Sequence, residues 1–411
     1  MKISVLSDLH FGYSYNTELE NDSFDNAEEA IDKSLDSDLI LICGDVFDIR
    51  GPRTPTWAKA LKIMNKPLLK DNPGVKLINV DKELKEISKR TLAHLPIVAI
   101  HGNHERLVKG EQNTVEALEN AGLLVHLHLN TIIFEKDGVK VAVHGMSSVP
   151  ERYAKDILYQ WNPQPVKDCF NILVFHQNID PFVFSPIEPP TLNISNLPKG
   201  FDIIINGHIH THTMEQLGNT KLIMPGSTVI TQFQRSESEV EKVIVKLTIG
   251  KDASVDFIPL ETNRKFFYEE IDLTNVTIQD VVEKKINDIL FSKNFAKKPV
   301  IRIKLTGTQI VNDKELNAIT NRYSEKAIVI FAKEIESPEI VESLEFLKNL
   351  KEQRLSIEEI GLNLLGKNLS ALNFESGFYY EDIFHLLSEG EIDNAYSILI
   401  GDQKSLIQFG R

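Results

Sequence analysis

Three histidines alternate in the segment INGHIHTHTM at residues 205–214, namely His208, His210 and His212. Imidazole is a common metal ligand, and alternate residues of an extended segment point to the same side. A His-x-His pair can therefore hold one ion together or reach two neighbouring ions. Because the chain has 12 histidines in 411 residues, such an alternation also arises by chance. The segment needs support from other residues.

That support comes from metal-binding side chains that follow several short apolar runs. They occur in SDLH, CGDVFD, HGNHE and FHQN, and with GHIH they make up one candidate set: Asp8, His10, Asp45, Asn103, His104, His176, His208 and His210. Each motif alone is weak, because a lone histidine at a strand end is usually a core or surface residue. Together they predict a metal cluster, since α/β sheets present their sites at strand ends. Carboxylate, amide and imidazole ligands without thiolate suit Mn, Fe or Zn.

The ordered set DLH, GD, GNHE, H and GHIH resembles the calcineurin-like metallophosphoesterase superfamily over residues 1–230. The resemblance implies that one ion is held by Asp8, His10, Asp45 and His210. It implies a second ion, which shares Asp45, at Asn103, His176 and His208. Two such ions, roughly 3.5–4 Å apart, turn a bridging water into hydroxide and hold phosphate oxygens for in-line attack. His104 would be a non-ligand histidine that stabilises charge or protonates the leaving oxygen. We do not expect His212 to be a ligand.

Longer stretches resemble a narrower family. LSDLHFGYSY, GDVFDIRGPRTPTWAKAL, FHQNIDPF and MPGSTVITQFQRSESEVEKVIVKL are similar to the SbcD or Meiotic-Recombination-Eleven type nucleases of double-strand-break repair, in an archaeal-like form. The resemblance is strong over residues 1–250 and only architectural beyond them. It implies a manganese-dependent exonuclease of duplex ends and endonuclease of single strands or hairpins, with two Mn²⁺ ions. It also implies a homodimer and a coiled-coil ABC-type ATPase partner of the SbcC kind.

Two features depart from that family. Many members have histidine three residues after the bridging aspartate, where this chain has Asp48. An acid cannot serve as a cationic phosphate contact, so the balance of exonuclease and endonuclease activity stays open. The stretch between Asp45 and Asn103 is also long, and its additional charged segment at residues 72–89 could reshape the DNA channel or the dimer surface.

The charge restricts how the chain could bind DNA. The net charge of -14 is not that of a protein that coats nucleic acid by itself. Contact with DNA would need metal ions, a partner or a local basic patch. Arg50, Arg53 and Tyr13 are the candidate DNA contacts, although an ordinary solvated loop is the commoner explanation for such residues.

The two cysteines and the hydropathy indicate a compartment. Cys43 and Cys169 lie in apolar runs, which predicts buried thiols in a reducing environment. No apolar run approaches the ~20 residues of a membrane span, and the N-terminal MKISVLSD is too short for a signal peptide. We therefore expect a cytoplasmic, nucleoid-associated protein without membrane contact.

The positions of apolar runs predict an α/β fold. Over residues 1–262 we expect a two-sheet metallophosphoesterase sandwich flanked by helices, because continuous runs such as ILVF indicate strands buried on both faces. The strands are expected at Ile3–Leu6, Leu39–Cys43, Ile97–Ile100, Val139–His144, Ile172–Phe175, Ile203–Ile205, Leu222–Met224 and Val243–Leu247. Helices are expected at Asn26–Leu35, Thr56–Met64 and Asn113–Asn120. The later strands follow one another closely, which predicts a partly antiparallel core.

Two further regions follow. Residues 263–335 are predicted as a small α/β capping domain, with strands at 266–273, 301–305 and 327–331 and helices at 278–291 and 313–323. In that domain Ile301, Ile303 and Leu305 alternate with Arg302 and Lys304, as in a strand with one wet face. Residues 336–411 are predicted as a helical region with apolar residues at near-helical spacing: Ile340, Leu344, Leu347, Ile357, Ile360, Phe384 and Leu387. This region is either a small subdomain packed on the rest or the docking site of the ATPase, which the family resemblance favours.

Alternatives remain for the assembly and the activity. Trp57, Leu61 and Met64 form a stripe at helical spacing that suits a dimer interface formed by segments 56–64 and 113–123, or else the chain's own core. A metallophosphatase or phosphodiesterase acting on small molecules or phosphoproteins explains the metal motifs equally well, but it leaves the later regions without a role. A DNA-tethering scaffold with little catalysis is the non-enzymatic alternative, against which the complete ligand set argues.

Overall fold

The structure is a computed structural model that describes residues 1–333 apart from 107–110, 184–189, 251–252, 275–276 and 308–310. Beyond residue 333 it describes helix α11 (Tyr380–Ser388) and the positions 361–362, 365–366, 369, 396 and 398. The chain divides into two compact units. One consists of Met1–Glu270, Gln279–Lys304 and Asn312–Ala332, and the other of Ile271–Ile278, Leu305–Val311 and Lys333–Arg411.

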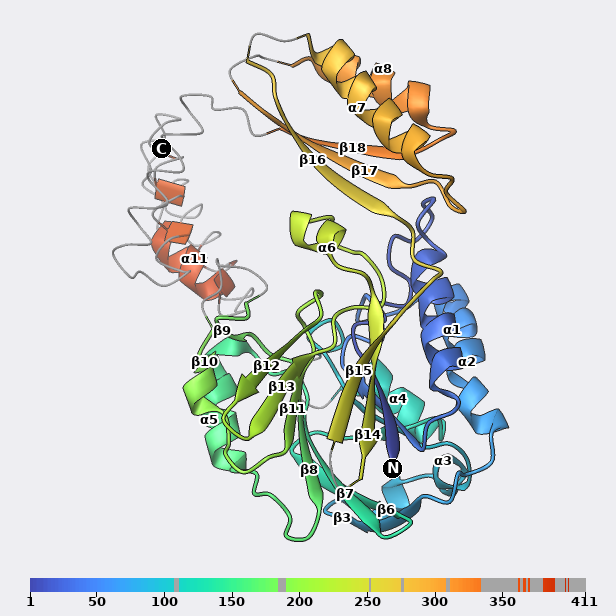
Figure 1. The fold of residues 1–411 in the computed structure, drawn as a ribbon. Coiled ribbons are helices and arrows are strands. Elements are labelled where there is room, and N and C mark those ends of the chain that lie inside the picture. Colours follow the sequence, from blue (N-terminus) through green and yellow to red (C-terminus); the bar gives the residue numbers. More distant parts are fainter. Residues whose placement is uncertain are drawn as a thin grey trace, which may run out of the picture. The chain divides into compact units, whose positions relative to one another are not determined.

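Two sheets form the main core, as the apolar runs predicted (Figure 1). The six-stranded sheet has the order β15 (Ala253–Pro259), β14 (Val243–Ile249), β1 (Lys2–Leu6), β2 (Leu39–Cys43), β4 (Ile97–Ile100) and β5 (Val125–His126). The seven-stranded sheet has the order β12 (Thr213–Leu217), β13 (Thr220–Met224), β11 (Ile203–Asn206), β8 (Phe170–Phe175), β7 (Val139–Met146), β6 (Asn130–Lys136) and β3 (Lys76–Val80). Strands β1, β2 and β4 run parallel, as do β7, β8 and β11. Strand β14 pairs antiparallel with β1, and β6 pairs antiparallel with β7. The predicted partly antiparallel, two-sheet core is confirmed.

The sheets pack against each other and are covered by helices. Side chains of β1 and β2 share one buried cluster with side chains of β7, β8 and β11. The other face of the six-stranded sheet is covered by α1 (Asp22–Ser34), α2 (Thr54–Met64) and α4 (Thr114–Asn120). Helix α5 (Glu151–Trp161) packs on the outer face of the seven-stranded sheet. The result is a four-layer sandwich, and this buried arrangement aligns the ends of the central strands.

The segment at 72–89 has a structural role in this sandwich. It contributes β3, which pairs antiparallel with β6 at the edge of the seven-stranded sheet. A short 3-10 helix (Leu84–Glu86) follows, and α3 (Lys89–Ala93) comes next with Ser88 as its N-cap. That this segment reshapes a DNA channel or a dimer surface remains a prediction.

The predicted interface stripe of Trp57, Leu61 and Met64 on α2 is wrong at one residue, Met64. Met64 is fully buried in the chain's own core, together with Ala60 and Ile63. Trp57 and Leu61 are only partly buried and pack against the same cluster. Because positions spaced by three and four residues share a helix face, the face that contains Met64 is turned toward the six-stranded sheet. Met64 is therefore a core residue and not an interface residue.

A separate three-stranded sheet has the order β16 (Phe266–Asp272), β17 (Val300–Thr306) and β18 (Ile328–Lys333). Helices α7 (Ile278–Ser292) and α8 (Asp313–Tyr323) lie together over it (Figure 1). The five predicted elements of residues 263–335 are thus confirmed, and the domain boundaries 1–262, 263–335 and 336–411 remain predictions. Of the predicted helical region, α11 lies among the described residues, while Ile340, Leu344, Leu347, Ile357 and Ile360 lie outside them.

The remaining elements are short. Strands β9 (Ile179–Asp180) and β10 (Leu192–Asn193) form a two-stranded sheet, and α6 (Arg235–Glu239) precedes β14. Both cysteines are free thiols. Cys43 is buried as predicted, but Cys169 is partly exposed because it lies in the turn before β8. None of the described helices is long and apolar enough to cross a membrane.

Candidate metal centre

The predicted ligands come from strand ends of both sheets. Asp8 and His10 follow β1, Asp45 follows β2, and Asn103 and His104 follow β4. The seven-stranded sheet contributes the other three after β8 and β11: His176, His208 and His210. Because the central strands of each sheet are parallel, their carboxyl ends meet at one edge, which is where α/β sheets present functional groups.

These side chains form two neighbouring groups. One ligand atom each of Asp8, His10 and His210 lie within 4.8 Å of one another, and so do those of Asp45, His176 and His208. Atoms of His10, Asp45 and His104 form a third group by the same distance. The first two groups agree with the division that the family resemblance implied. Asn103 joins the second group, since its Oδ1 lies 3.1 Å from Nε2 of His176.

Lone pairs converge in the second group. The Nδ1–H of His176 donates to the carbonyl oxygen of Cys43 at 2.8 Å, which directs Nε2 into the site. That atom faces Asn103 Oδ1 at 3.1 Å and Asp45 Oδ2 at 3.2 Å. Oxygen and nitrogen atoms this close need a positive charge among them, which is the proton of His176 in the absence of metal and the ion when metal is bound. The donor set therefore fits a divalent cation.

The first group shows the same property. Nε2 of His10 and Nε2 of His210 are 3.3 Å apart, while Nδ1 of each ring lies next to an oxygen atom. Oδ1 of Asp8 is buried and has no hydrogen-bond partner among the described residues. It lies 3.6 Å from Nε2 of His210. Buried polar atoms are nearly always paired, so an unpaired carboxylate oxygen facing two imidazole nitrogens also fits a cation.

The electrostatics of the buried groups favour a bound positive charge. Burial lowers the pKa of His176, but the carboxylates of Asp45 and Asp8 outweigh that effect and raise the pKa to about 10. Burial raises the pKa of Asp45, yet the positive charge on His176 dominates and holds this pKa well below its usual range. Burial lowers the pKa of His208 to about 3 and that of His210 well below its usual value. The neutral imidazoles of His208 and His210 are in the protonation state that metal binding requires, whereas a bound cation would replace the proton of His176.

The backbone at four candidate ligands lies in the left-handed region. The φ angles of Asp8, His10, Asp45 and His208 are 51°, 47°, 47° and 74°. Such conformations cost about 1–3 kcal/mol each for residues other than glycine and cluster at functional sites. The loops that carry them are bonded to each other, since Asp8 N–H donates to Gly44 O and His10 N–H donates to Asp45 O. The surrounding fold thus holds these side chains in place against local strain.

Two glycines are required by close approach. A Cβ atom at Gly102 would lie 2.0 Å from Oδ1 of Asp45, and one at Gly207 would lie 2.2 Å from Cys43 O. Both contacts are far inside van der Waals distance. The glycine of GNHE and that of GHIH therefore let the strand ends of the two sheets come together around Asp45 and His176.

His104 differs from the candidate ligands in exposure and orientation. Its side chain is 35% exposed, whereas that of Asp45 is 1% exposed. The Nδ1–H donates to the carbonyl oxygen of Asp48 at 2.5 Å, and Nε2 lies 3.9 Å from Oδ2 of Asp45. Its backbone N–H donates to Oδ1 of Asp45 at 3.0 Å. An anchored imidazole at the accessible margin of the site suits contact with a substrate.

Two residues support the site in ways that the sequence did not predict. The carboxylate of Asp48 lies 3.2 Å from Nδ1 of His10. Glu105, the last residue of GNHE, accepts the N–H groups of Phe47 and Gly102 at 2.7 Å each. Burial, together with the charge of Asp45, raises the pKa of Glu105 to about 8. Both residues stand in the motifs CGDVFD and HGNHE, next to candidate ligands.

The predicted DNA contacts have structural partners of their own. Tyr13 is half-buried and donates its hydroxyl to Thr231 O at 2.8 Å. The guanidinium of Arg53 lies over the ring of Tyr15 at 4.7 Å. Arg50 is exposed on the same loop. His212 lies apart from the cluster and contacts Glu241 O through Nδ1 at 3.0 Å. Roles of Tyr13, Arg50 and Arg53 in DNA binding remain predictions.

Comparison with known proteins places this geometry in a family. Residues 1–212 match the family described as calcineurin-like phosphoesterase. The chain belongs to the calcineurin-like phosphoesterases. The chemistry of this family is hydrolysis of phosphoester bonds by a metal-dependent site, which agrees with the two groups of converging ligands.

Individual relatives are more distant. The chain is similar to double-strand break repair protein mus-23 of Neurospora crassa, with 26% identity over 309 residues that cover 67% of this chain and 41% of that protein. It is similar to double-strand break repair protein MRE11 of Arabidopsis thaliana, with 23% identity over 432 residues that cover 90% of this chain and 59% of that one. Among solved structures, a putative 5'-nucleotidase from Staphylococcus aureus matches with 18% identity and a TM-score of 0.38, and the match covers 70% of this chain and 58% of that one. The chain therefore spans less than two thirds of either repair protein.

Proposed function

We propose that this phosphoesterase is a two-metal DNA nuclease that processes double-strand breaks, with two Mn²⁺ ions or other divalent transition metals as cofactors. One observation carries the proposal. Two groups of potential ligand atoms, each within 4.8 Å of one another, lie side by side, one around Asp8 and one around Asp45. Asp8, His10, Asp45 and His210 would hold one ion, and Asp45, Asn103, His176 and His208 the other.

The contacts of individual residues support a role for each within the proposed site. Divalent ions bound there would activate water and polarise the phosphate ester. His104 presents Nε2 on the accessible side, because its Nδ1–H is anchored at the carbonyl of Asp48. It would donate a hydrogen bond to the phosphate in the transition state or a proton to the leaving oxygen. The near-complete burial of Asp8, His10, Asp45 and His176 excludes bulk water from the ligands, which strengthens their hold on charge.

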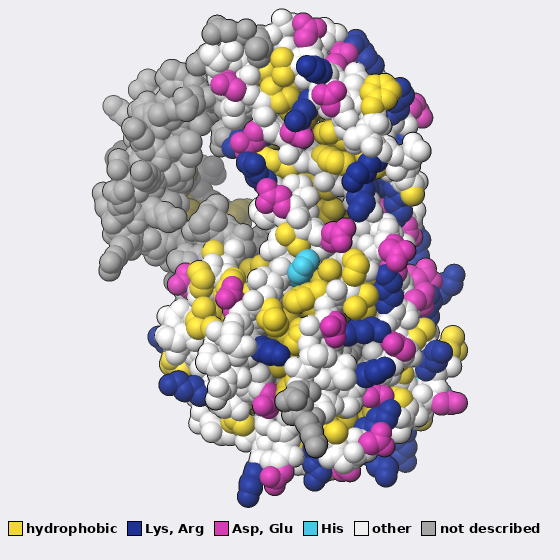
Figure 2. Space-filling view, viewed as in Figure 1, with side chains coloured by type: hydrophobic (Ala, Val, Ile, Leu, Met, Phe, Trp, Pro, Cys, Tyr) yellow, Lys and Arg dark blue, Asp and Glu magenta, His cyan; other side chains and the backbone are white. Residues whose placement is uncertain are grey.

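The DNA substrate is supported by the two repair proteins to which the chain is similar. The surface does not act as a simple polycation. Lys and Arg are interspersed with Asp and Glu over the coloured residues of Figure 2, and the net charge is -14. We infer that metal ions and a partner provide the attraction for the phosphates. The proposed partner is the coiled-coil ABC-type ATPase, docked on the region beyond residue 336, and the proposed location is the nucleoid.

The homodimer is part of the same proposal. With Met64 in the core, the exposed side of α2 and its neighbours would form the contact between copies. Light scattering of the full chain at micromolar concentration measures this directly. We expect the mass of two chains, and a stable monomer would contradict the dimer.

Substrate choice is the decisive test. We expect the Mn²⁺-loaded protein to degrade duplex DNA from its ends and to cut hairpins, with slower action on p-nitrophenyl phosphates. The reverse preference would indicate a phosphatase or phosphodiesterase of small molecules or phosphoproteins. Binding of DNA ends without cleavage of any phosphoester would indicate a tethering scaffold.

A further inference from the structure

The segment between β13 and β14 contacts the candidate ligand His210 on the side of the ring away from Nε2. Thr231 Oγ1 lies 2.8 Å from Nδ1 of His210, and the side-chain amide nitrogen of Gln232 lies 3.3 Å from the same atom. Lys242 Nζ donates to the carbonyl oxygen of His210 at 3.0 Å. Both the far nitrogen of the ring and the main chain of His210 are therefore held by this one segment.

These contacts surround Nδ1 of His210 and leave Nε2 to face the metal site. With the proton on Nδ1, the hydroxyl oxygen of Thr231 accepts it, and the lone pair that a metal needs is on Nε2. The carboxylate of Glu237, 4.0 Å from Nδ1, favours the same tautomer. Nε2 then faces Asp8 Oδ1 at 3.6 Å. Partners of this kind orient metal-binding histidines and affect metal affinity.

The segment itself lacks regular structure at Thr231–Phe233 and depends on side-chain anchors. Phe233 has φ of 52°, a left-handed conformation that a residue with a large side chain rarely adopts. Glu237 Oε2 accepts the N–H of Gln232 at 2.8 Å and the N–H of Phe233 at 3.0 Å. Lys242, also buried, bonds to Oε1 of Glu237 at 2.7 Å. The backbone N–H groups of Gln232 and Phe233 are thus both held by the carboxylate of Glu237.

Arg302 holds the backbone carbonyl groups of the same segment. Its NH1 group donates to the carbonyl oxygens of Gln232 at 3.2 Å and Phe233 at 3.0 Å. The alternation of residues 301–305 predicted a solvent-exposed position for Arg302 on β17, but the structure shows it partly buried against this segment. A guanidinium has several donors in a fixed planar arrangement, so one side chain can fix two successive carbonyl groups.

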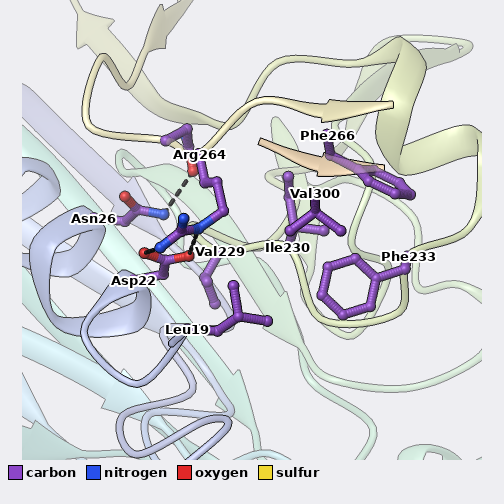
Figure 3. A pocket seen from close by; sticks show the side chains of 10 residues that line it. Leu19, Asp22, Asn26, Val229, Ile230, Phe233, Arg264, Phe266 and Val300 are labelled. Carbon is purple, nitrogen blue, oxygen red and sulfur yellow. Dashed lines mark hydrogen bonds and ion pairs between the residues drawn. The ribbon is translucent and has the colours of Figure 1, made fainter. Parts of the chain in front are cut away.

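Apolar contacts seat the same segment on the three-stranded sheet. The ring of Phe233 meets that of Phe266 of β16 edge to face, with 5.4 Å between the centroids. Ile230, Phe233, Phe266 and Val300 line one small cavity and point toward one another (Figure 3). The position of the segment is therefore determined by strands β16 and β17 as much as by the main core.

We propose that Arg302 is a positioning residue for His210. It fixes the backbone at Gln232 and Phe233, and through that backbone it places the side chains of Thr231 and Gln232 against Nδ1 of the imidazole. The inference rests on the proposed metal centre. It extends the set of residues that control the centre to β17 of the three-stranded sheet.

The test compares two arginine variants in the full-length protein. Arg302→Gln removes the double contact to the segment. Arg322→Gln is the matched control, because Arg322 pairs with Glu283 between α8 and α7. We expect Mn²⁺ titration calorimetry to show about tenfold weaker binding at one of the two metal positions in Arg302→Gln, with the other position unchanged. The spin-coupled Mn²⁺ signal in electron paramagnetic resonance should weaken in parallel. Arg322→Gln should retain both properties.

A double-mutant cycle tests the route of the effect. Thr231→Val removes the hydroxyl at Nδ1 and keeps the side-chain shape. If Arg302 acts through the segment, the loss of affinity in the double variant is smaller than the product of the two single losses. Independent, multiplying effects would overturn the proposed route.

Two further outcomes separate the inference from the proposed function. Should the wild type bind two Mn²⁺ ions and Arg302→Gln bind both with equal affinity, the inference fails and the metal centre stands. Should the wild type bind no Mn²⁺, the proposed metal centre itself fails. If Arg302→Gln does not fold by circular dichroism, Arg302→Lys decides, because its single ammonium can still reach a carbonyl and an intermediate loss is expected.

Discussion

The carboxylate of Asp48 lies 3.2 Å from Nδ1 of His10, on the side of the ring opposite His210. This contact gives Asp48 a structural role at the candidate metal centre. The resemblance to repair nucleases implies a histidine at this position, and the chain instead has an acid beside a buried imidazole. The carbonyl oxygen of the same residue anchors His104. One residue therefore contacts both a candidate ligand and the candidate catalytic histidine.

Removal of the Asp48 carboxylate should weaken metal binding. We expect Asp48→Ala to lower Mn²⁺ affinity by about 10–100-fold, because loss of a partner that orients a metal-binding histidine has effects of this size. Asp48→Asn should retain most of the affinity, since its side-chain carbonyl can still accept from Nδ1 of His10. Calorimetric Mn²⁺ titration of the two variants distinguishes them. Equal losses would show that the carboxylate acts through its charge alone.

His104→Ala should separate catalysis from metal binding. Its imidazole is exposed at the margin of the site, so we expect DNA cleavage to fall by about 10²–10³-fold with both ions retained. Initial rates and metal content per chain are the measurements. His94→Ala is the control, since His94 precedes β4 and contacts Lys70 O instead. An ion missing from the His104 variant would make this residue a ligand.

Glu29 should make stability depend on acid pH. Burial raises its pKa, but hydrogen bonds from Glu261 N–H, Lys33 and Thr262 outweigh that effect and lower the pKa to about 2. A lowered folded pKa means that the stabilisation is present above the ordinary value of 4.5 and is lost as pH falls from 4.5 toward 2. We expect Glu29→Gln to destabilise by about 1 kcal/mol at pH 7, a magnitude reduced by solvent screening.

The difference between Glu29→Gln and wild type should shrink when urea unfolding is repeated at pH 3. Glu28→Gln is the neighbouring control, because the Glu28 carboxylate pairs with Lys66 at 2.7 Å and is 45% exposed. A deficit of equal size at both pH values would show that the Glu29 contacts do not depend on its charge.

A substitution on α11 tests the docking of the ATPase. Leu387 is 53% exposed, and an apolar side chain of this exposure on a helix suits a partner contact. We expect Leu387→Glu to reduce co-purification with a coiled-coil ATPase at least tenfold and to leave Mn²⁺-dependent cleavage of simple DNA ends unchanged. Undiminished co-purification would place the interface elsewhere.

The central strands and the candidate ligands could be predicted from sequence because both depend on local patterns. Runs such as LILIC and IIIN are buried on both faces wherever they pack, and polar residues just after them reach the sheet edge. The roles of Arg302 and Lys242 could not be predicted, since their partners at Gln232 and His210 are brought close only by tertiary packing. Arg302 followed a wet-face alternation and yet is partly buried, because a loop covers that face of β17. The stripe of Trp57, Leu61 and Met64 showed helical spacing but could not show which side of the helix faces the core.

The candidate centre takes ligands from both sheets, Asp45 from one and His176 from the other. Neither half of the sandwich can assemble the site before the two sheets dock. Metal should therefore associate late in folding, after the two sheets have packed against each other. It should bind the folded sandwich much more tightly than any partly folded form. By mass action, cellular manganese would then raise the fraction of chains in the docked state, so that scarcity of the metal would reduce the lifetime of the protein as well as its activity.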